Sequence, residues 1–459
     1  MARLITVASM PRVCFYLLAL LVAVPAFAAR KDRHVILITI DGFPARLWAD
    51  PSLPLPTLRQ LAAQGAAATA METSNPSVTW PAHTTLVTGV SPRTHGVLFN
   101  GLVVRQGPGK PLKIEPWVDK TSLVFTPTLY DIASAAGLTT AESDWVAVTR
   151  AKGITWSFGE IPNPNGLVEQ AMIAAGVATA DDMQKMQPGQ RQKTIWRDGM
   201  WTRAAAFMFS QYKPNLLLYH TLNTDGIHHR YGPGTDPSYT ALAYADRLVG
   251  DLLKTVDETG LRSQTTIIIT TDHGFKTVTQ YMYPNVVLKQ AGLLKAAGPT
   301  VTHCDAYTLS SGGIAQVYVT DPARRAELVP KLKELFKQAA GVDRVIDGRD
   351  GHSIGLPTPE ENASMGDLVL YAKTGHAFSG AANGDVVVGP TVNYSGTHGY
   401  FNGDPELDGI FIASGAGIKP GVKLGRIRNV DVAPTLARLM ELELPKVEGR
   451  VLEEILTGN

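Results

Sequence analysis

Short apolar runs alternate with segments of helical apolar spacing along most of the chain. Three runs are almost continuously apolar, as expected for parallel strands buried on both faces: 34–40, 215–222 and 265–271. Helical spacing occurs in four segments: 57–64, 239–258, 324–340 and 431–442. This alternation predicts an α/β fold with a mostly parallel central sheet and helices on both faces.

The stretch 276–394 interrupts this rhythm. It has a strand pattern of its own at 313–320, a helical segment and glycine-rich connections, and the pattern of the central sheet resumes only at 409–414. We therefore expect one catalytic domain over 29–459, with a cap domain inserted at about 276–394.

The N-terminal segment, 1–28, has the pattern of a secretory signal peptide. Arg3 and Arg12 precede an apolar run at 13–24, and the run is followed by Ala26-Phe27-Ala28. We expect cleavage before Ala29, and hence a secreted or periplasmic protein without a membrane segment after cleavage. An uncleaved N-terminal anchor is the alternative.

Composition narrows the classes of function. The 459 residues are 44% hydrophobic and 18% charged, which excludes a chain that is disordered throughout. Lys and Arg number 42 and Asp and Glu 41, so the net charge is +1 and no stable complex with nucleic acid is expected. Function must depend on local sites, and the sequence leaves the oligomeric state open.

Acidic residues follow each of the three predicted strands. Asp41 and Asp272 come directly after strands, and Asp225 follows the second strand at a distance of three residues. Because the carboxyl ends of strands in an open α/β sheet gather ligand sites, these three carboxylates are expected to share one site. Taken singly, each could equally be a helix cap or a turn residue.

Histidines near these carboxylates suggest a metal centre. Asp225 and His229 are four residues apart, which places both on one face of a helix, although His228 at three residues could also face that way. His273 follows Asp272, and His398 lies among glycines that permit close approach of the backbone. A single histidine of this kind is more often structural.

Thr79 is the candidate nucleophile. Pro81 favours a helix start at this point, where unpaired backbone amides attract an anion. A threonine in this place could instead be only a helix N-cap. Coordination to a divalent cation would make its hydroxyl a competent nucleophile.

Several ordered motifs carry a family resemblance. They are ITIDGF (38–43), TWPAHTTLVTG (79–89), SPRTHGVLFN (91–100), TDGIHHRYGP (224–233), TDHGF (271–275) and GTHGY (396–400). With these motifs, the chain resembles the alkaline phosphatase superfamily in its nucleotide pyrophosphatase/phosphodiesterase branch, also called type I phosphodiesterases.

The resemblance implies a site with two zinc ions and a covalent phosphothreonine intermediate. One ion would be held by Asp225, His229 and His398, and the other by Asp41, Asp272 and His273 together with Thr79. Asn100 would donate to a phosphate oxygen. The substrate would be a small phosphate ester, cleaved at a phosphodiester or nucleotide pyrophosphate bond. Mixed carboxylate and imidazole ligands suit Zn²⁺ better than Mg²⁺, with Mn²⁺ and Fe as alternatives.

Departures from the family pattern keep other functions open. The stretch before Asp225, His220-Thr-Leu-Asn-Thr, lacks the Glu and the Pro that diesterases of this branch commonly have there. Sulfatases have Arg four residues after the nucleophile, whereas this chain has His83 four residues after Thr79, so sulfatase activity is not expected. A phosphomonoesterase or phosphonate hydrolase on the same metals is the alternative activity, for which Arg150 and Lys152 are the nearest cationic candidates. A non-catalytic binding protein is the third possibility. We expect an open apolar neighbourhood around Phe99 and Gly101, which would favour diesters.

Overall fold

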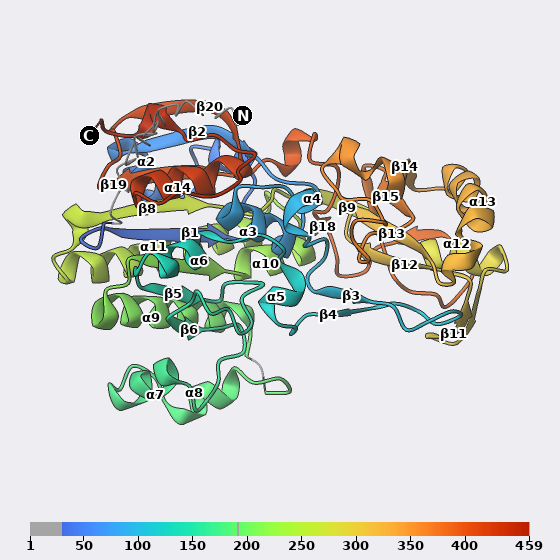
Figure 1. Cartoon of the computed structure of the whole chain (residues 1–459), viewed down its shortest axis with the longest axis horizontal. Helices are drawn as coiled ribbons and strands as arrows, with labels where there is room; N and C mark the ends of the chain where they lie inside the picture. The colour runs from blue at the N-terminus through green and yellow to red at the C-terminus, as the bar shows by residue number, and fades with distance from the viewer. Residues whose placement is uncertain (1–29, 191, 459) are drawn as a thin grey trace, which may run out of the picture.

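The structure is a computed structural model that describes residues 30–190 and 192–458 (Figure 1). The predicted signal peptide, 1–28, lies outside these residues. In the part of the chain that is described, no helix combines the length and the apolar character needed to cross a membrane.

A mostly parallel sheet forms the centre of the larger part of the molecule (Figure 1). Within the described residues it has eight strands, of which only β19 runs antiparallel to its neighbours. This arrangement confirms the predicted fold class. In spatial order the strands are β20 (Val422–Arg428), β2 (Ala66–Glu72), β19 (Phe411–Gly415), β8 (Thr265–Thr270), β1 (His34–Ile40), β7 (Leu216–Thr221), β5 (Thr140–Ser143) and β6 (Trp156–Phe158).

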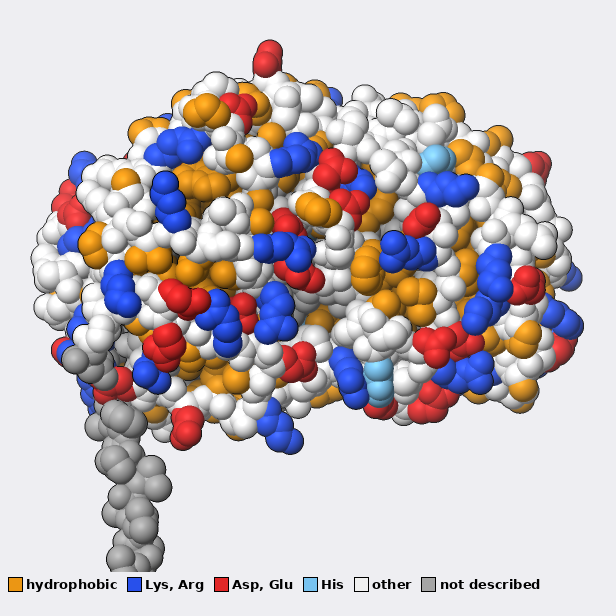
Figure 2. Space-filling view, turned by 90° about the horizontal axis from the view of Figure 1, so that it is seen from above, with side chains coloured by type: hydrophobic (Ala, Val, Ile, Leu, Met, Phe, Trp, Pro, Cys, Tyr) orange, Lys and Arg blue, Asp and Glu red, His pale blue; other side chains and the backbone are white. Residues whose placement is uncertain are grey.

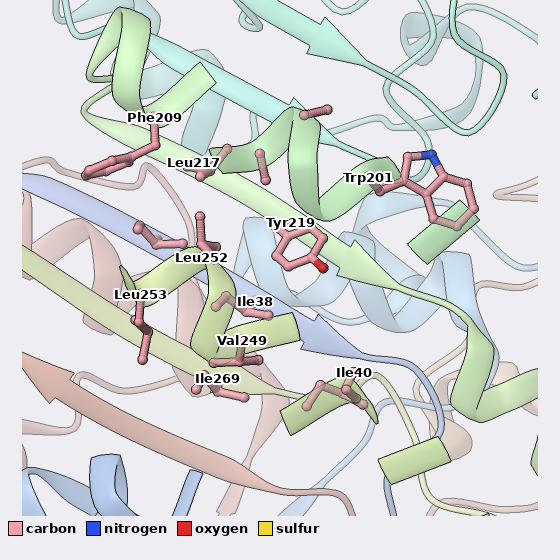
Figure 3. Packing of buried hydrophobic residues seen from close by; sticks show 14 of the residues in the cluster. Ile38, Ile40, Trp201, Phe209, Leu217, Tyr219, Val249, Leu252, Leu253 and Ile269 are labelled. Carbon is pink, nitrogen blue, oxygen red and sulfur yellow. The ribbon is translucent and has the colours of Figure 1, made fainter. Parts of the chain in front are cut away.

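Both faces of this sheet are buried, which explains the continuous apolar runs. On β1, Ile36 and Ile38 pack into a hydrophobic cluster on one face, whereas Val35 and Leu37 pack into a second cluster on the other face. Figure 3 shows the first cluster, where side chains from β1, β7 and β8 meet the helices above them. Alternate side chains of one strand thus fill two separate cores.

Helices cover the two faces of the sheet. The first cluster takes side chains from α2 (Pro56–Gln64), α7 (Leu167–Ala174), α8 (Ala180–Lys185), α9 (Thr194–Tyr212) and α11 (Asp236–Glu258). The second cluster takes side chains from α3 (Thr79–Thr88), α6 (Leu129–Ala135) and α14 (Val432–Leu439). The other described helices of this part are α1 (Ala45–Trp48), α4 (Pro92–His95), α5 (Lys120–Leu123) and α10 (Asn223–Tyr231).

Helix α11 illustrates how the sequence specifies these layers. Leu242, Val249 and Val256 recur at helical spacing and are buried in the first cluster. The helix begins at Asp236, three residues before the predicted start, because the Thr235 hydroxyl caps it by accepting a hydrogen bond from the amide of Ser238. All four predicted helices are confirmed, with bounds that differ from the expected ones by three residues at most.

A second group of strands lies at the other end of the molecule (Figure 1). Its main sheet is antiparallel and has a hydrophobic cluster of its own, to which α13 contributes. This region lies within the stretch 276–394, and its description as an inserted cap domain stays a prediction. Its elements are β9 (Lys276–Met282), α12 (Pro284–Gln290), β10 (Leu294–Ala297), β11 (Thr300–Cys304), β12 (Ala306–Ser311), β13 (Ile314–Val319), α13 (Arg325–Lys337), β14 (Val342–Asp347), β15 (Leu368–Ala372), β16 (Gly375–Phe378) and β17 (Val388–Pro390).

Three short strands complete the described structure. β3 (Leu102–Val104) and β4 (Lys113–Glu115) form an antiparallel pair, and β18 (Gly396–Thr397) pairs with β9. On the face shown in Figure 2, Lys and Arg side chains are interspersed with Asp and Glu, so charge of one sign does not dominate this surface.

Truncation of Leu217 should test how much the central core contributes to stability. This β7 side chain is fully buried in the first cluster (Figure 3), so Leu217→Ala should lower the free energy of unfolding by about 2–5 kcal/mol. Urea denaturation followed by tryptophan fluorescence would measure the loss. Lys254→Ala on the exposed side of α11, where the side chain is 77% exposed, should change it by less than about 0.5 kcal/mol. Equal losses for the two variants would contradict this description of the core.

Candidate metal centre and nucleophile

The topology brings the three predicted carboxylates to one edge of the central sheet. β8, β1 and β7 are parallel neighbours, and each ends at this edge. Asp41 follows β1 directly, Asp272 follows β8 after one residue, and Asp225 lies in the first turn of α10, the helix after β7. The carboxylates therefore converge although they are far apart in the sequence.

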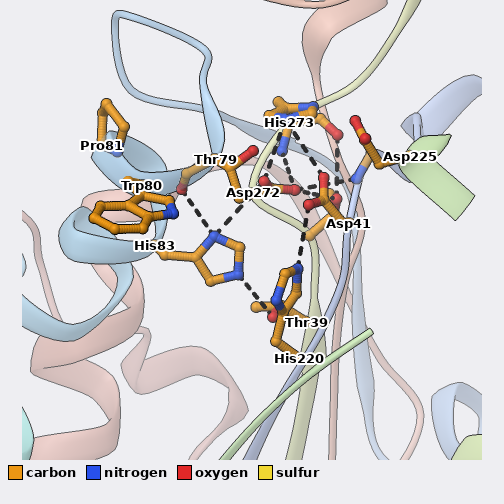
Figure 4. A network of polar contacts seen from close by, with 12 residues as sticks. Thr39, Asp41, Thr79, Trp80, Pro81, His83, His220, Asp225, Asp272 and His273 are labelled. Carbon is orange, nitrogen blue, oxygen red and sulfur yellow. Dashed lines mark hydrogen bonds and ion pairs between the residues drawn. The ribbon is translucent and has the colours of Figure 1, made fainter. Parts of the chain in front are cut away.

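Two overlapping groups of side chains could each hold a metal ion. The ligand atoms of Asp41, Asp272 and His273, which are labelled in Figure 4, all lie within 4.8 Å of one another. The ligand atoms of Asp225, His273 and His398 also lie within 4.8 Å of one another. His273 belongs to both groups, and its ring stacks on that of His398 with centroids 3.7 Å apart. One continuous cluster therefore contains residues from both of the ligand sets that the resemblance implies.

The helical register of α10 distinguishes His229 from His228. Nε2 of His229 lies 3.3 Å from Oδ1 of Asp225, one turn earlier on the same face, and Nε2 of His398 lies 3.7 Å from the same oxygen. His228 instead uses both ring nitrogens elsewhere, at 3.0 Å from the carbonyl oxygen of Gly42 and 2.6 Å from Oγ of Ser238. The geometry thus favours His229 as the ligand of this helix.

Backbone carbonyls orient the three candidate imidazole ligands in the same way. In each ring Nδ1 donates to a backbone carbonyl oxygen. His229 donates to Gly396 at 2.9 Å, His273 donates to Gly274 at 3.1 Å, and His398 donates to Ser77 at 2.8 Å. With the proton on Nδ1, each ring presents the lone pair of Nε2 to the cluster.

Glycines beside His398 permit this close approach. A Cβ on Gly399, whose φ is +86°, would lie 2.2 Å from the carbonyl oxygen of Ser311. A Cβ on Gly396 would lie 2.4 Å from the carbonyl oxygen of His228. Neither position has room for a side chain, so the backbone can pass close to α10 at Gly396 and to the end of β12 at Gly399 only because these residues are glycine.

The polar atoms of the cluster fit a bound cation. Oδ1 of Asp41, Oδ1 of Asp225, Oδ2 of Asp272 and Nε2 of His273 are buried and, within the described part of the chain, have no hydrogen-bond partner. Such atoms are costly to leave unpaired, and all four are ligand types for zinc. The residues present therefore fit a metal site of the predicted kind.

Electrostatics favours the same conclusion. Burial, followed by the nearby charges of Asp272 and Asp225, raises the pKa of Asp41 well above its usual value. Burial lowers the pKa of His273 to about 4 and that of His398 to about 3, so both rings are neutral near pH 7 and can act as ligands. Without a cation, the crowded carboxylates would repel one another.

Thr79 stands at the N-terminus of α3, next to this cluster (Figure 4). The cap position belongs to Val78, and Thr79 is the first residue of the helix, so the interpretation of Thr79 as only an N-cap is wrong. His83, one turn later, links it to the cluster. Nδ1 of His83 lies 2.8 Å from the carbonyl oxygen of Thr79 and 3.6 Å from Oδ2 of Asp272. Thr79 as a whole is buried, with 8% of its surface exposed.

Asn100 lies beside the same helix terminus. Its Oδ1 accepts a hydrogen bond of 3.0 Å from the amide of Trp80, the residue after Thr79. The oxygen is used in this contact, and the exposed side chain keeps two N–H donors on its amide nitrogen.

The residues around Phe99 and Gly101 do not form the open neighbourhood that the sequence predicted. Phe99 is 2% exposed and packs in a hydrophobic cluster, and a Cβ on Gly101 would lie 2.7 Å from Cγ2 of Ile114. The expected open neighbourhood around these two residues is therefore wrong. A pocket of about 570 Å³ lies instead beside Trp80, with Trp117, Trp145 and Trp156 among its lining residues.

The two cationic candidates do not form a phosphate clamp in this structure. Arg150 is at the pocket, but its guanidinium group pairs with the carboxylate of Asp119. Lys152 is exposed and is not among the residues that line the pocket.

His220 and Asp144 were missed as site residues. Nε2 of His220 lies 3.2 Å from Oδ2 of Asp41, and Nδ1 lies 3.3 Å from Oδ2 of Asp144. A histidine inside an otherwise apolar buried strand was the available signal, because such a ring needs polar partners. The identity of those partners depends on which strands are neighbours, and the sequence does not state this.

The fold and site together define an alkaline phosphatase-like α/β class, in which strand ends gather carboxylates and imidazoles beside a helix-terminal threonine. The family model described as type I phosphodiesterase / nucleotide pyrophosphatase matches residues 35–401, and the chain belongs to this family. The resemblance inferred from the motifs is thereby confirmed, together with the hydrolase class that it implies.

Individual relatives agree with this assignment. Human ectonucleotide pyrophosphatase/phosphodiesterase family member 7 is 24% identical over 431 residues, covering 91% of this chain and 81% of that protein. The structure of human ectonucleotide pyrophosphatase / phosphodiesterase 5 superposes with a TM-score of 0.68 at 16% identity, covering 93% of this chain and 100% of that one. An inactive threonine-to-alanine variant of the murine protein 5, in complex with AMP, superposes with a TM-score of 0.67 at 15% identity. These two likenesses show the fold.

Substitution of the two adjacent histidines should separate ligand from structural residue. His229→Ala should lower the zinc content of the purified protein by about one ion per chain, because it removes one of a small set of ligands. His228→Ala should keep the zinc content and lower the melting temperature instead, because it leaves Ser238 and Gly42 without their partner. Elemental analysis and thermal unfolding would measure the two effects. A greater loss of zinc in His228→Ala than in His229→Ala would mean that α10 directs His228, and not His229, toward the cluster.

Proposed function

We propose that this protein hydrolyses phosphodiester or nucleotide pyrophosphate bonds through a covalent intermediate on Thr79, at a site for two zinc ions. One observation carries the proposal: buried carboxylate and imidazole ligand atoms without partners lie beside a threonine at the start of a helix. Membership in the type I phosphodiesterase / nucleotide pyrophosphatase family supports it.

The ligand atoms divide into two sets. Asp41, Asp272 and His273 would hold the ion nearer the nucleophile. The other ion would be held by the residues of α10 and the loop after β18, namely Asp225, His229 and His398. Bound zinc would supply Lewis-acid charge that favours the alkoxide of Thr79 and offsets negative charge on the phosphoryl group.

Thr79 acts as the nucleophile. Its Oγ1 forms a bond to phosphorus, while the bond from phosphorus to the leaving-group oxygen breaks and that oxygen takes up a proton. A water molecule then attacks the same phosphorus, the bond to Oγ1 breaks, and Thr79 regains its proton. The N-terminus of α3 favours negative charge at this position throughout.

Two features of the chain would orient the substrate. The amide nitrogen of Asn100 can donate to a phosphate oxygen, because the oxygen of this side chain is already held by the amide of Trp80. The pocket beside Trp80 offers space and aromatic surface for the second substituent of a diester. The complex of the murine relative with AMP supports a small nucleotide-like ligand for this chain.

The alternative activity, phosphomonoester or phosphonate hydrolysis, has weaker support. A monoester dianion carries more charge than a diester, so a monoesterase gains from Arg or Lys donors near the phosphoryl group. Arg150 is paired with Asp119, and Lys152 is exposed outside the pocket. The described residues around the pocket thus favour a diester.

Replacement of Thr79 should abolish turnover without removing the metal. We expect Thr79→Ala to lower kcat by on the order of 10⁴-fold or more, because the covalent route is lost, whereas the zinc content stays near normal. Thr79→Ser, which keeps a hydroxyl group, should retain part of the activity. Steady-state kinetics, elemental analysis and trapping of the phosphorylated residue would test this. Phosphate trapped on any other side chain would refute the assignment.

The preference between ester classes should follow from the pocket. A bis-aryl phosphate diester or a nucleotide phosphoanhydride should be cleaved with higher kcat/KM than the matched aryl monoester, because the pocket offers space rather than positive charge. Lys152→Ala should leave the ratio unchanged. A preference of about 100-fold for the monoester, or about 2.7 kcal/mol in transition-state free energy, that Lys152→Ala removes would favour a phosphomonoesterase.

A further inference from the structure

Asp41, His220 and Asp144 form a line of contacts across three adjacent parallel strands. Asp41 follows β1, His220 lies in β7 opposite Thr39, and Asp144 follows β5. The side chains of all three are at most 2% exposed. The adjacency of the three strands therefore places a buried histidine between two buried carboxylates.

The histidine ring is held from both sides. Its Nε2 lies 3.2 Å from Oδ2 of Asp41, and its Nδ1 donates to the carbonyl oxygen of Asp144 at 3.0 Å. Oδ2 of Asp144, which is buried and has no hydrogen-bond partner among the described residues, lies 3.3 Å from the same Nδ1. Carbonyl and carboxylate oxygens accept hydrogen bonds, so the ring donates toward both neighbours.

The backbone of Asp144 is unusual in a way that serves this contact. Its φ is +58°, in the left-handed region that residues other than glycine seldom adopt. In this conformation its carbonyl oxygen meets the ring of His220 while its own amide donates to the carbonyl oxygen of Phe158 at 3.0 Å. The left-handed conformation costs free energy in a residue other than glycine, and it persists where the surrounding structure determines it.

The two carboxylate oxygens of Asp41 make different contacts. Oδ2 meets His220, whereas Oδ1 is buried, lacks a hydrogen-bond partner within the described chain and lies 3.5 Å from Nε2 of His273 (Figure 4). A carboxylate held by one oxygen cannot rotate freely, so its other oxygen stays directed into the cluster.

His83 does not share this role. Its ring packs edge-on against that of His220, with centroids 4.6 Å apart. Its nitrogens, however, meet the carbonyl oxygen of Thr79 at 2.8 Å and Oγ1 of Thr39 at 2.9 Å. The contact that orients Asp41 therefore comes from His220.

We propose that His220 and Asp144 are positioning residues that hold the Asp41 carboxylate with Oδ1 directed into the metal cluster. The inference rests on the proposed function in one respect, the assignment of Asp41 as a metal ligand. Partners that orient a ligand in this way commonly change metal affinity by about 10–100-fold when they are removed.

The test compares zinc affinity in His220→Gln, Asp144→Asn and the double variant, measured by competition with a chromophoric chelator. Each single variant should bind zinc about 10–100-fold more weakly than the wild type. The double variant should bind no more weakly than His220→Gln alone, because Asp144 acts through His220. Asp144→Asn keeps the size of the side chain, so it decides the question if His220→Gln does not fold.

Asp246→Asn is the matched control. Asp246 is also a buried carboxylate, but it accepts hydrogen bonds from the amides of Thr57 and Leu58 at the start of α2. This variant should lower the melting temperature and leave zinc affinity unchanged. Thermal unfolding of the metal-free proteins would show whether the site variants lose stability instead of affinity.

The outcomes separate this inference from the proposed function. Unchanged zinc affinity in a folded Asp144→Asn or His220→Gln protein would overturn the positioning role, and additive losses in the double variant would overturn the action of Asp144 through His220. A wild-type protein that binds zinc but hydrolyses no phosphodiester would overturn only the proposed function. A wild-type protein without affinity for any divalent metal would overturn both.

Discussion

Mutual repulsion among three carboxylates, each with a buried oxygen, is the constraint on which the rest of this molecule depends. Asp41, Asp225 and Asp272 face one another at the edge of the central sheet, and each has a buried oxygen that no hydrogen bond within the described residues satisfies. Desolvated like charges are unfavourable unless a cation or a proton offsets them. The parallel neighbours β8, β1 and β7, packed on both faces, supply the rigidity that keeps the carboxylates together.

The same constraint connects the cluster to the nucleophile. The ring of His398 is oriented by the carbonyl oxygen of Ser77, which lies in the loop just before Thr79. His83 contacts the carbonyl oxygen of Thr79 and approaches Asp272. The position of the helix start and the orientation of the ligands are thus determined by shared hydrogen bonds, so a change in one is expected to disturb the other.

Much of the central fold could be predicted because β1, β7 and β8 are buried on both faces and therefore apolar at nearly every position. Strands at the margin of this sheet carry weaker signals. β2 is rich in alanine, and β5 contains the buried Glu142, whose side chain is satisfied by Ser157 and the amide of Trp145. Neither pattern resembles a buried strand until its neighbours are known.

For the site, local spacing was informative and long-range adjacency was not. The spacing of four positions from Asp225 to His229 already implies one helical face, which α10 provides. The contact of His220 with Asp144 depends instead on β5 lying next to β7, and this order is a property of the whole sheet. The position of the pocket was missed for the same reason, because tryptophans from separate segments line it.

The distribution of charge around the cluster bears on which phosphate esters the site can accept. Arg150, the one Lys or Arg among the described residues that line the pocket, is already paired with Asp119, whereas Glu142, Glu160 and Glu169 also line the walls. An anionic ligand must therefore find its positive charge at the metal cluster and the helix terminus rather than in the pocket. The pocket can then contribute mainly through contact with an uncharged or cationic substituent. A phosphate with one negative charge and a bulky second group suits this distribution of charge. It requires less compensating positive charge than a dianion, and its second group can contact more of the aromatic surface beside Trp80.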